Sequence, residues 1–225
     1  MKKITILLAD DHAVLRHGLR ALMVAEPDMD VVGEAETGRQ AVELAKKLRP
    51  AVAIVDIAMP GLNGLEATRQ ITREVPGTKV IILSSYGEDE YVAQLTEAGA
   101  TGYLLKQTAS GDLLKAIRDV SRGNPAFSPA ISKRLLEYYR TAFSHGKPVK
   151  PTGVHLTSRE IEVLQLIAEG KANKEIAADL GISAKTADKH RQHLKEKLNI
   201  HDIAGLTRYA MTKGIVENRV AVPLS

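Results

Sequence analysis

Five short runs rich in β-branched residues alternate with longer amphipathic segments in the N-terminal half, and this alternation constrains the fold more than any other feature of the chain. The expected strands cover residues 4–9, 31–35, 52–55, 79–83 and 102–105. The expected helices cover residues 13–25, 39–48, 65–74, 90–98 and 113–122. Strands that alternate with helices pair in parallel through right-handed crossovers. The sequence therefore predicts an α/β domain built on a five-stranded, doubly wound parallel sheet.

The alternation stops near Gly123. An isolated amphipathic segment, residues 130–143, then leads into a polar stretch with two prolines and two glycines, residues 144–153. Such a composition is typical of a linker. Residues 155–216 carry only helical periodicity. We therefore expect three parts: an α/β domain over 1–122, a linker with one amphipathic helix over 123–154, and a small all-α domain over 155–225.

The composition narrows the compartment and the class of protein. The 225 residues include no cysteine, which excludes disulfides, thiolate metal sites and cysteine nucleophiles. The start, MKKITILLADDH, has an apolar stretch too short for a signal peptide, and two aspartates follow it. No run approaches the ~20 apolar residues of a membrane span. We expect a cytoplasmic protein that does not associate with membranes.

Charged or hydroxyl side chains stand at the carboxyl ends of four of the five expected strands: Asp10 with Asp11, Asp56, Ser84 and Lys106. The carboxyl ends of parallel strands gather at one edge of the sheet, where open α/β sheets bind their ligands. Three neighbouring carboxylates repel one another unless a cation neutralises them, and oxygen ligands suit Mg²⁺. Asp56 is then the expected nucleophile toward a phosphoryl group.

Each of these residues also has an ordinary structural explanation. A single aspartate at a strand end is usually a turn or helix-cap residue, and Asp10 or Asp11 could cap the helix that begins near Ala13. A single lysine is usually a solvated surface group. The combination of Asp-Asp, Asp, Ser and Lys, one βα unit apart at the same edge, favours a shared site.

The same residues lie within four motifs that match a known family in order and spacing: LLADDH, AIVDIAMPGLNG, VIILSSY and GATGYLLK. Over residues 1 to about 122 the chain resembles the flavodoxin-like receiver domain of two-component response regulators. The resemblance implies that Mg²⁺ is bound by Asp11, Asp56 and the backbone carbonyl of Ala58, with Asp10 acting partly through water.

The resemblance also assigns the phosphorylation chemistry. It implies that Asp56 accepts a phosphoryl group from a sensor histidine kinase. Ser84 would donate a hydrogen bond to that group, Lys106 would pair with it, and Tyr103 would report the switch by rotating inward. Gln107 departs from the family pattern, in which proline commonly follows this lysine.

The C-terminal segment divides into helices at its own capping residues. Thr157 and Glu160 form a capping-box pattern for the first helix, which Gly170 ends. A short second helix covers residues 173–180. A turn containing Gly181 precedes a third helix that runs to about residue 198. This spacing is typical of a helix-turn-helix.

The third of these helices has an apolar face and a polar face that can enter a DNA groove. Net charge is only +4, but residues 185–197 hold five Lys or Arg against two acids. On the polar face Lys189 can donate to guanine, Gln192 can read adenine, and Asp188 can accept from cytosine. For an arbitrary helix, such a face is more often simply solvated. The candidate DNA contacts are Lys174, Lys185, Thr186, Asp188, Lys189, Arg191 and Gln192.

The motifs LTSREIEVLQLIAEG, NKEIAADLGIS, KTADKHRQHLKEKL and RYAMTKG resemble the LuxR-type DNA-binding domain. The whole chain is thus similar to NarL/FixJ-type response regulators. This implies a transcriptional regulator that binds promoter DNA as a homodimer after phosphorylation, with residues 183–198 in the major groove and residues 203–213 contributing to dimerisation. RNA polymerase is a further expected partner. Ala172 departs from the family pattern, since Ser or Thr commonly caps the second helix there.

Two other classes of protein remain as alternatives. An aspartate-dependent phosphohydrolase usually carries a second acid two residues after its nucleophile, where this chain has Ala58. A phosphate-independent scaffold would not need the complete set of acids, Ser84 and Lys106. We therefore expect no enzymatic activity beyond phosphorylation and dephosphorylation of Asp56 itself.

Overall fold

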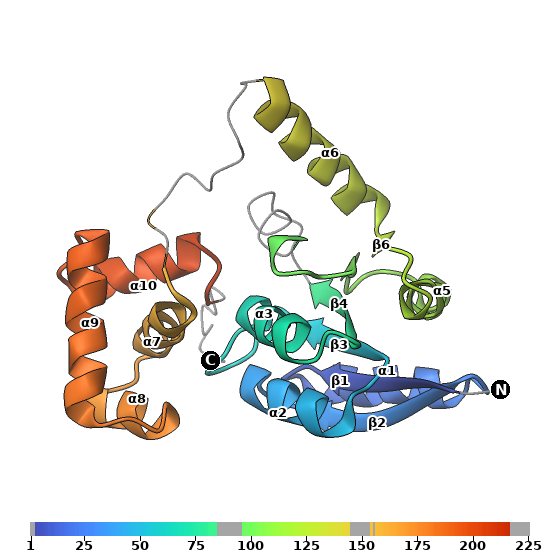
Figure 1. Ribbon diagram of the computed structural model, residues 1–225, viewed down its shortest axis with the longest axis horizontal. Helices are drawn as coiled ribbons and strands as arrows, with labels where there is room; N and C mark the ends of the chain where they lie inside the picture. Colours follow the sequence, from blue (N-terminus) through green and yellow to red (C-terminus); the bar gives the residue numbers. More distant parts are fainter. Residues whose placement is uncertain (1–2, 85–95, 145–153, 155, 217–225) are drawn as a thin grey trace, which may run out of the picture. The chain divides into compact units, whose positions relative to one another are not determined.

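A parallel β-sheet is the framework of the first compact unit, residues 1–151 (Figure 1). The computed structural model describes residues 3–84, 96–144, 154 and 156–216. Every strand pairing is parallel, in the spatial order β2-β1-β3-β4-β5-β6. The strands are β1 (Ile4–Ala9), β2 (Met29–Ala35), β3 (Val52–Asp56), β4 (Lys79–Ser84), β5 (Gly102–Leu105) and β6 (Ala126–Phe127).

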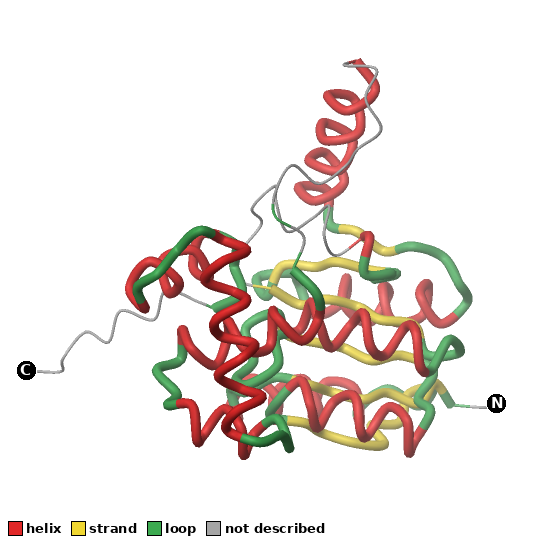
Figure 2. The backbone as a smooth tube through the Cα atoms, turned by 60° about the vertical axis from the view of Figure 1, so that its left-hand side comes forward, coloured by secondary structure: helices red, strands yellow, loops and turns green. Residues whose placement is uncertain are grey.

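Helices cover both faces of this sheet (Figure 2). Alternate side chains of a strand point to opposite faces, so each strand contributes to two cores. Leu7 of β1 belongs to the core that includes residues of α2 (Gly38–Leu48) and α3 (Gly64–Glu74). Ile6 belongs to the opposite core, with residues of α1 (Ala13–Val24) and α5 (Ser110–Ser121). The doubly wound arrangement predicted from the sequence is confirmed.

The sequence predicts five strands, whereas the part of the chain that the structure describes forms six. The additional strand, β6, pairs in parallel with β5. The Ala126 amide donates to the Thr101 carbonyl oxygen at 3.1 Å, and the Ser128 amide donates to the Tyr103 carbonyl oxygen at 3.0 Å. A strand of two residues, Ala-Phe, is too short to show any alternation of apolar and polar positions. Hydrophobic patterning could not reveal it.

Helix α6 (Pro129–Ser144) begins on the same unit. The Ile131 side chain is fully buried in the core that contains Tyr103, and Leu135 packs against this core. Residues 126–135 of the segment expected to be a linker therefore pack against the α/β unit. Leu136 remains 65% exposed, so the helix presents apolar surface on its other side.

The remaining boundaries are close to the predicted ones. Strand β2 begins at Met29, two residues before the predicted start, because it pairs there with Ile4 of β1 although Asp30 interrupts the apolar run. Helix α5 begins at Ser110, three residues early. Most of the helix predicted over residues 90–98 lies outside the described residues.

The second compact unit, residues 152–225, is helical in its described part. Its helices are α7 (Ser158–Ala168), α8 (Asn173–Asp179), α9 (Ala184–Leu198) and α10 (Ile203–Thr212). They share one core, in which Leu164, Leu194 and Leu206 are fully buried. Among the helices that the structure describes, none combines the length and apolar character that crossing a membrane requires.

The N-terminal caps of α7 and α8 differ as their sequences predict. At α7 the Thr157 amide donates to the Glu160 carboxylate at 2.8 Å, and the Glu160 amide donates to the Thr157 hydroxyl, which confirms the capping box. At α8 the N-cap is Ala172, which has no acceptor; its amide donates to the Glu175 carboxylate at 2.7 Å. Half of a capping box therefore remains at α8.

Candidate functional site

The ends of β1 and β3 bring the predicted acids together. These strands are neighbours, with Ala9 beside Val55, so the residues that follow them lie side by side. Asp10 and Asp56 are each 3% exposed, and Asp11 is more open. Oxygen atoms of the three carboxylates and a ring nitrogen of His12 all lie within 4.8 Å of one another. Such a cluster of hard donors suits a divalent cation.

Lys106, which follows β5, reaches into this acid cluster. Its Nζ lies 2.9 Å from Oδ2 of Asp56 and 3.1 Å from Oδ2 of Asp10. The Lys106 amide donates to the Ser84 carbonyl oxygen at 2.7 Å, which ties the residue to the end of β4. Both carboxylates are buried, so this bridge lies largely outside solvent.

Burial sets the protonation behaviour of the site. It raises the pKa of Asp56 to about 6, and the Asp10 and Asp11 charges act in the same direction, while Lys106 opposes them. Burial alone would lower the pKa of Lys106, but the Asp56 and Asp10 carboxylates outweigh it and raise that pKa. At neutral pH the site thus holds an ammonium group beside a mostly ionised Asp56.

The other predicted residues of this site take up the expected places along the strands. Ser84 ends β4 and is 1% exposed; it pairs with Leu105, next to Lys106. Tyr103 of β5 is buried with its ring in the α2–α3 core. Ala58 lies two residues beyond Asp56, in the loop that follows β3. Among the described residues no peptide bond is cis, so the bond before Gln107 is trans.

Two residues beside the acids escaped the sequence analysis. Nδ1 of His12 lies 2.8 Å from Asp11 Oδ1 and 3.2 Å from Asp10 Oδ1. In the sequence, only the position of His12 next to Asp11 could have indicated that its ring lies beside the acids. Gly64 packs so closely that an added Cβ would lie 1.9 Å from the Asp56 carbonyl oxygen. Its amide donates to the Ile57 carbonyl oxygen at 2.8 Å, which closes the loop after β3.

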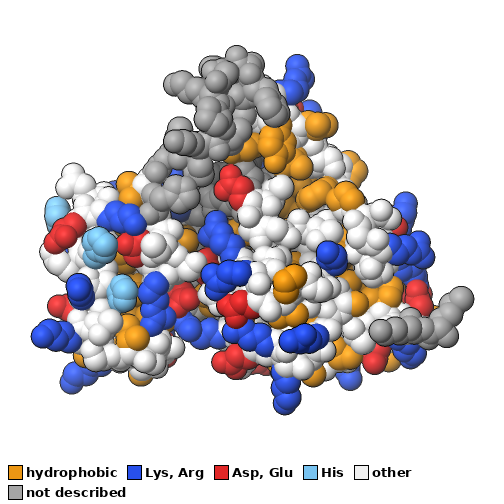
Figure 3. Space-filling view, in the orientation of Figure 1, with side chains coloured by type: hydrophobic (Ala, Val, Ile, Leu, Met, Phe, Trp, Pro, Cys, Tyr) orange, Lys and Arg blue, Asp and Glu red, His pale blue; other side chains and the backbone are white. Residues whose placement is uncertain are grey.

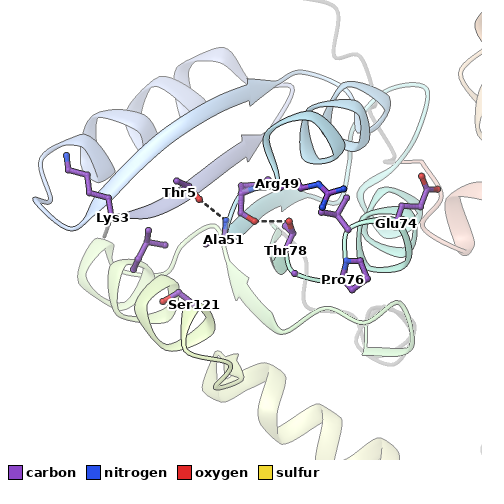
Figure 4. Close-up of a pocket in the computed structure, with 12 residues that line it drawn as sticks. Lys3, Thr5, Arg49, Ala51, Glu74, Pro76, Thr78 and Ser121 are labelled. Carbon is purple, nitrogen blue, oxygen red and sulfur yellow. Dashed lines mark hydrogen bonds between the residues drawn. The ribbon is translucent and has the colours of Figure 1, made fainter. Parts of the chain in front are cut away.

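One hollow near the sheet lies at the opposite end of the strands from the acids (Figure 4). It measures about 590 Å³, and two of the hydroxyl groups that line it are used within the protein. The Thr5 hydroxyl accepts from the Ala51 amide at 2.9 Å, and the Thr78 hydroxyl donates to the Pro50 carbonyl oxygen at 2.7 Å. These bonds join the starts of β1, β3 and β4, so the residues around this hollow have a structural role.

In the helical unit, α9 has the two faces predicted from the sequence. Ala187 and Leu194 are buried, while Lys185, Lys189 and Gln192 are exposed. Figure 3 shows basic, acidic and histidine side chains mixed over the surface of this unit. A shallow hollow of about 690 Å³ follows the exposed face of α9 and includes these three polar residues.

Two candidate DNA contacts are held by a neighbour from α8. The Asn173 side-chain amide donates to Asp188 at 3.0 Å, and its oxygen accepts from Arg191 Nη1 at 2.7 Å. Arg191 is half-buried as a result, whereas Thr186 and Lys174 are exposed. The side chains of Lys185, Lys189 and Gln192 therefore project from α9 with fewer ties to α8.

A doubly wound sheet with this acid, serine and lysine set at one edge, followed by a helix-turn-helix unit, defines a two-component response regulator. The chain belongs to that family. Residues 6–118 match the family described as the response regulator receiver domain, and residues 154–210 match the bacterial regulatory proteins of the luxR family. It is a transcriptional regulator with a receiver domain and a LuxR-type DNA-binding domain.

Curated relatives and solved structures agree with this assignment. The transcriptional regulatory protein LiaR of Bacillus subtilis is 40% identical over 213 residues, covering 95% of this chain and 99% of LiaR. The oxygen regulatory protein NreC of Staphylococcus carnosus is 36% identical over 214 residues, covering 94% of this chain and 99% of NreC.

Two solved response regulators are similar to this chain over nearly its whole length. The response regulator ChrA of a heme-sensing two-component system is 30% identical with a TM-score of 0.52, covering 96% of this chain and 100% of ChrA. RcsB of Salmonella typhimurium is 28% identical with a TM-score of 0.62, covering 95% and 99% of the two chains. A structure of an RcsB–DNA complex is also similar, at 27% identity and a TM-score of 0.58, covering 94% of this chain and 99% of that one.

Proposed function

We propose that Asp56 accepts a phosphoryl group from a sensor histidine kinase and that this modification controls promoter binding by the helical domain. The observation that carries the proposal is the bridge from Lys106 to the two buried carboxylates Asp56 and Asp10. A cation held over a buried acid at the end of a rigid strand prepares the site for a group that brings additional negative charge.

The donor set fits Mg²⁺, because three carboxylates offer the oxygen ligands that this ion prefers and their ligand atoms lie within 4.8 Å of one another. Asp11, Asp56 and the Ala58 carbonyl would hold the ion directly, and Asp10 would act partly through water. When bound, the ion would neutralise charge on the phosphoryl oxygens.

The chain's own residues supply the remaining chemistry. An oxygen of Asp56 forms a bond to phosphorus while the P–N bond to the kinase histidine breaks, and the histidine nitrogen leaves with the electron pair. Asp56 must be ionised to attack, and a pKa of about 6 leaves it mostly ionised at pH 7. Lys106 then pairs with a phosphoryl oxygen, and the Ser84 hydroxyl donates to another.

Phosphate incorporation tests this assignment. The full-length protein is incubated with a radiolabelled small-molecule acyl phosphate in Mg²⁺ buffer. We expect Asp56→Asn to take up no label, whereas Asp30→Asn, at an exposed acid of β2, labels like the wild type. Equal labelling of the Asp56 variant would reject Asp56 as the acceptor.

For the helical domain we propose that α9 enters the major groove of promoter DNA. Lys185, Lys189 and Gln192 would reach base edges, Thr186 and Lys174 would contact phosphates, and Asn173 would orient Asp188 and Arg191. A single module buries only about 600–1,000 Å² on DNA. We therefore propose that a homodimer forms on activation, that residues 203–213 contribute to it, and that the DNA-bound dimer contacts RNA polymerase in the cytoplasm.

Two lysine variants separate base reading from phosphate contact. Lys189→Ala should change the preferred base at one position by about 1–3 kcal/mol. Lys174→Ala should weaken binding to all sequences alike and reduce the salt slope by about 1. Selection from random DNA followed by titration at several salt concentrations measures both. A uniform effect of Lys189→Ala would contradict base reading by this residue.

A further inference from the structure

We propose that Arg16 is a positioning residue for the metal-binding acids. This residue is only 5% exposed although it lies on α1, at the surface of the receiver. Nη1 donates to the backbone carbonyl of Asp10 at 2.6 Å. Nη2 lies 2.7 Å from Glu36 and Nε lies 3.2 Å from Glu34, so all three guanidinium nitrogens have partners.

The bond to Asp10 fixes the turn that carries the acids. The Asp10 amide makes the last contact between β1 and β2, donating to the Ala35 carbonyl oxygen at 3.1 Å. The Asp10 carbonyl belongs to the next peptide unit, which also contains the Asp11 amide. Because a peptide unit is planar, holding this carbonyl sets the direction in which the chain enters Asp11. Arg16 thus orients a proposed Mg²⁺ ligand without touching the ion.

The carboxylates of Glu34 and Glu36 would hold the guanidinium in turn. Glu36 is 65% exposed and Glu34 is 30% exposed, so neither ion pair alone contributes much to stability. Together with the Asp10 carbonyl, however, they give the planar guanidinium one orientation. A lysine at this position could not reproduce the planar fork of three nitrogens that reaches these three acceptors, since its ammonium is a compact charge on a flexible stem.

Arg20 offers a matched control. It lies one turn further along α1, and its Nε is 3.4 Å from the same Glu34 carboxylate. This ion pair joins Arg20 to Glu34 and not to the turn after β1, and the Arg20 side chain is 45% exposed. Loss of Arg20 therefore removes a similar charge and a similar pairing but leaves the turn after β1 intact.

The test measures the Mg²⁺ dissociation constant of the full-length protein by calorimetry, well below the unfolding temperature. This inference rests on the proposed function. We expect Arg16→Lys and Arg16→Gln to weaken Mg²⁺ binding by about 10-fold or more, as changes in the outer shell of a metal site do. Arg20→Gln should stay close to the wild type. Glu36→Gln, at an exposed position that tolerates change, should weaken binding in the same direction by less.

A purely structural role would lower the thermal midpoint without changing Mg²⁺ affinity, so both quantities are measured on each variant. The amide shift of Asp11 in the metal-free protein provides a second readout, which should change in the Arg16 variants and not in Arg20→Gln. Unchanged affinity in Arg16→Lys and Glu36→Gln would overturn the inference. A wild-type protein that binds no Mg²⁺ would instead overturn the proposed function on which it rests.

Discussion

Asp56 combines the chemical role that we propose for it with a cost to stability. Its pKa is raised to about 6 by burial, from an ordinary value of 3.8. At pH values between 3.8 and about 6, Asp56 is mostly protonated in the folded protein and mostly ionised in the unfolded chain. The folded state therefore loses stability as pH rises through this window, and the loss is complete somewhat above pH 6. Burying the unneutralised charge is unfavourable, and the pairing with Lys106 offsets only part of this.

We predict that Asp56→Asn, which cannot ionise, is more stable than the wild type at pH 8 without Mg²⁺. The gain should be at most about 3 kcal/mol, because each pKa unit is worth about 1.4 kcal/mol, and it should shrink toward pH 4. Urea unfolding at several pH values measures it, with Asp30→Asn as the control. Added Mg²⁺ should narrow the difference by stabilising only the wild type. A difference that does not vary with pH would contradict this explanation.

Single residues also show where sequence reasoning succeeds and fails. The acids, Ser84 and Lys106 were predictable because each ends a recognisable strand. Arg16 was not, because its partners Glu34 and Glu36 are 18 and 20 residues away and nothing in an amphipathic helix marks one arginine as buried. Gly64 was not predictable either, since its close approach to Asp56 depends on the path of the folded backbone.

At the scale of the element, strands and helices were predicted correctly where the repeat of apolar positions extended over several residues. Strands β1 to β5 and helices α1, α2, α3 and α5 were recognisable from runs of four or more residues. Strand β6 was missed because two residues are too few to show a repeat of apolar and polar positions. Helix α6 was expected, but its packing through Ile131 was not, since an amphipathic pattern does not specify the surface that covers its apolar face.

Helix α8 offers a direct test of a capping signal. It lacks a side-chain acceptor at Ala172, and Asn173 does not replace it because its side chain bonds to Asp188 and Arg191. We predict that Ala172→Ser stabilises this helix by about 1 kcal/mol, by accepting a bond from the Glu175 amide.

Hydrogen exchange of the Glu175 amide in the full-length protein measures this gain, and exchange should become slower. The control is Ala178→Ser, at an exposed position inside the same helix, where serine lowers helix propensity and should speed exchange. Faster exchange in Ala172→Ser would show that the missing cap does not limit the stability of α8.

At the scale of the whole molecule, the energy available for switching is limited. Hydrogen bonds to charged groups contribute about 1.5–3 kcal/mol each, so Ser84 and Lys106 could supply roughly 3–6 kcal/mol on phosphorylation. Reversing a two-state equilibrium from 1:99 to 99:1 needs about 5.5 kcal/mol. Lys106, however, is already bound to Asp56 and Asp10 before phosphorylation. The net gain from Lys106 is therefore only the difference between two ionic contacts, and we expect a phosphorylated monomer to be incompletely switched.

Dimerisation can supply the remainder, because association that favours the active state stabilises it by about 2.7 kcal/mol at 100 times the dissociation constant. We therefore predict that the phosphodonor raises DNA affinity far more at protein concentrations above the dimer dissociation constant than at concentrations below it. Sedimentation equilibrium and DNA titration over the same range of protein concentration measure both effects. In Asp56→Asn, the donor should change neither dimerisation nor DNA affinity. Lys189→Ala should dimerise like the wild type and change only in its base preference. Full DNA affinity in a phosphorylated protein that remains monomeric would show that the receiver pocket alone completes the switch.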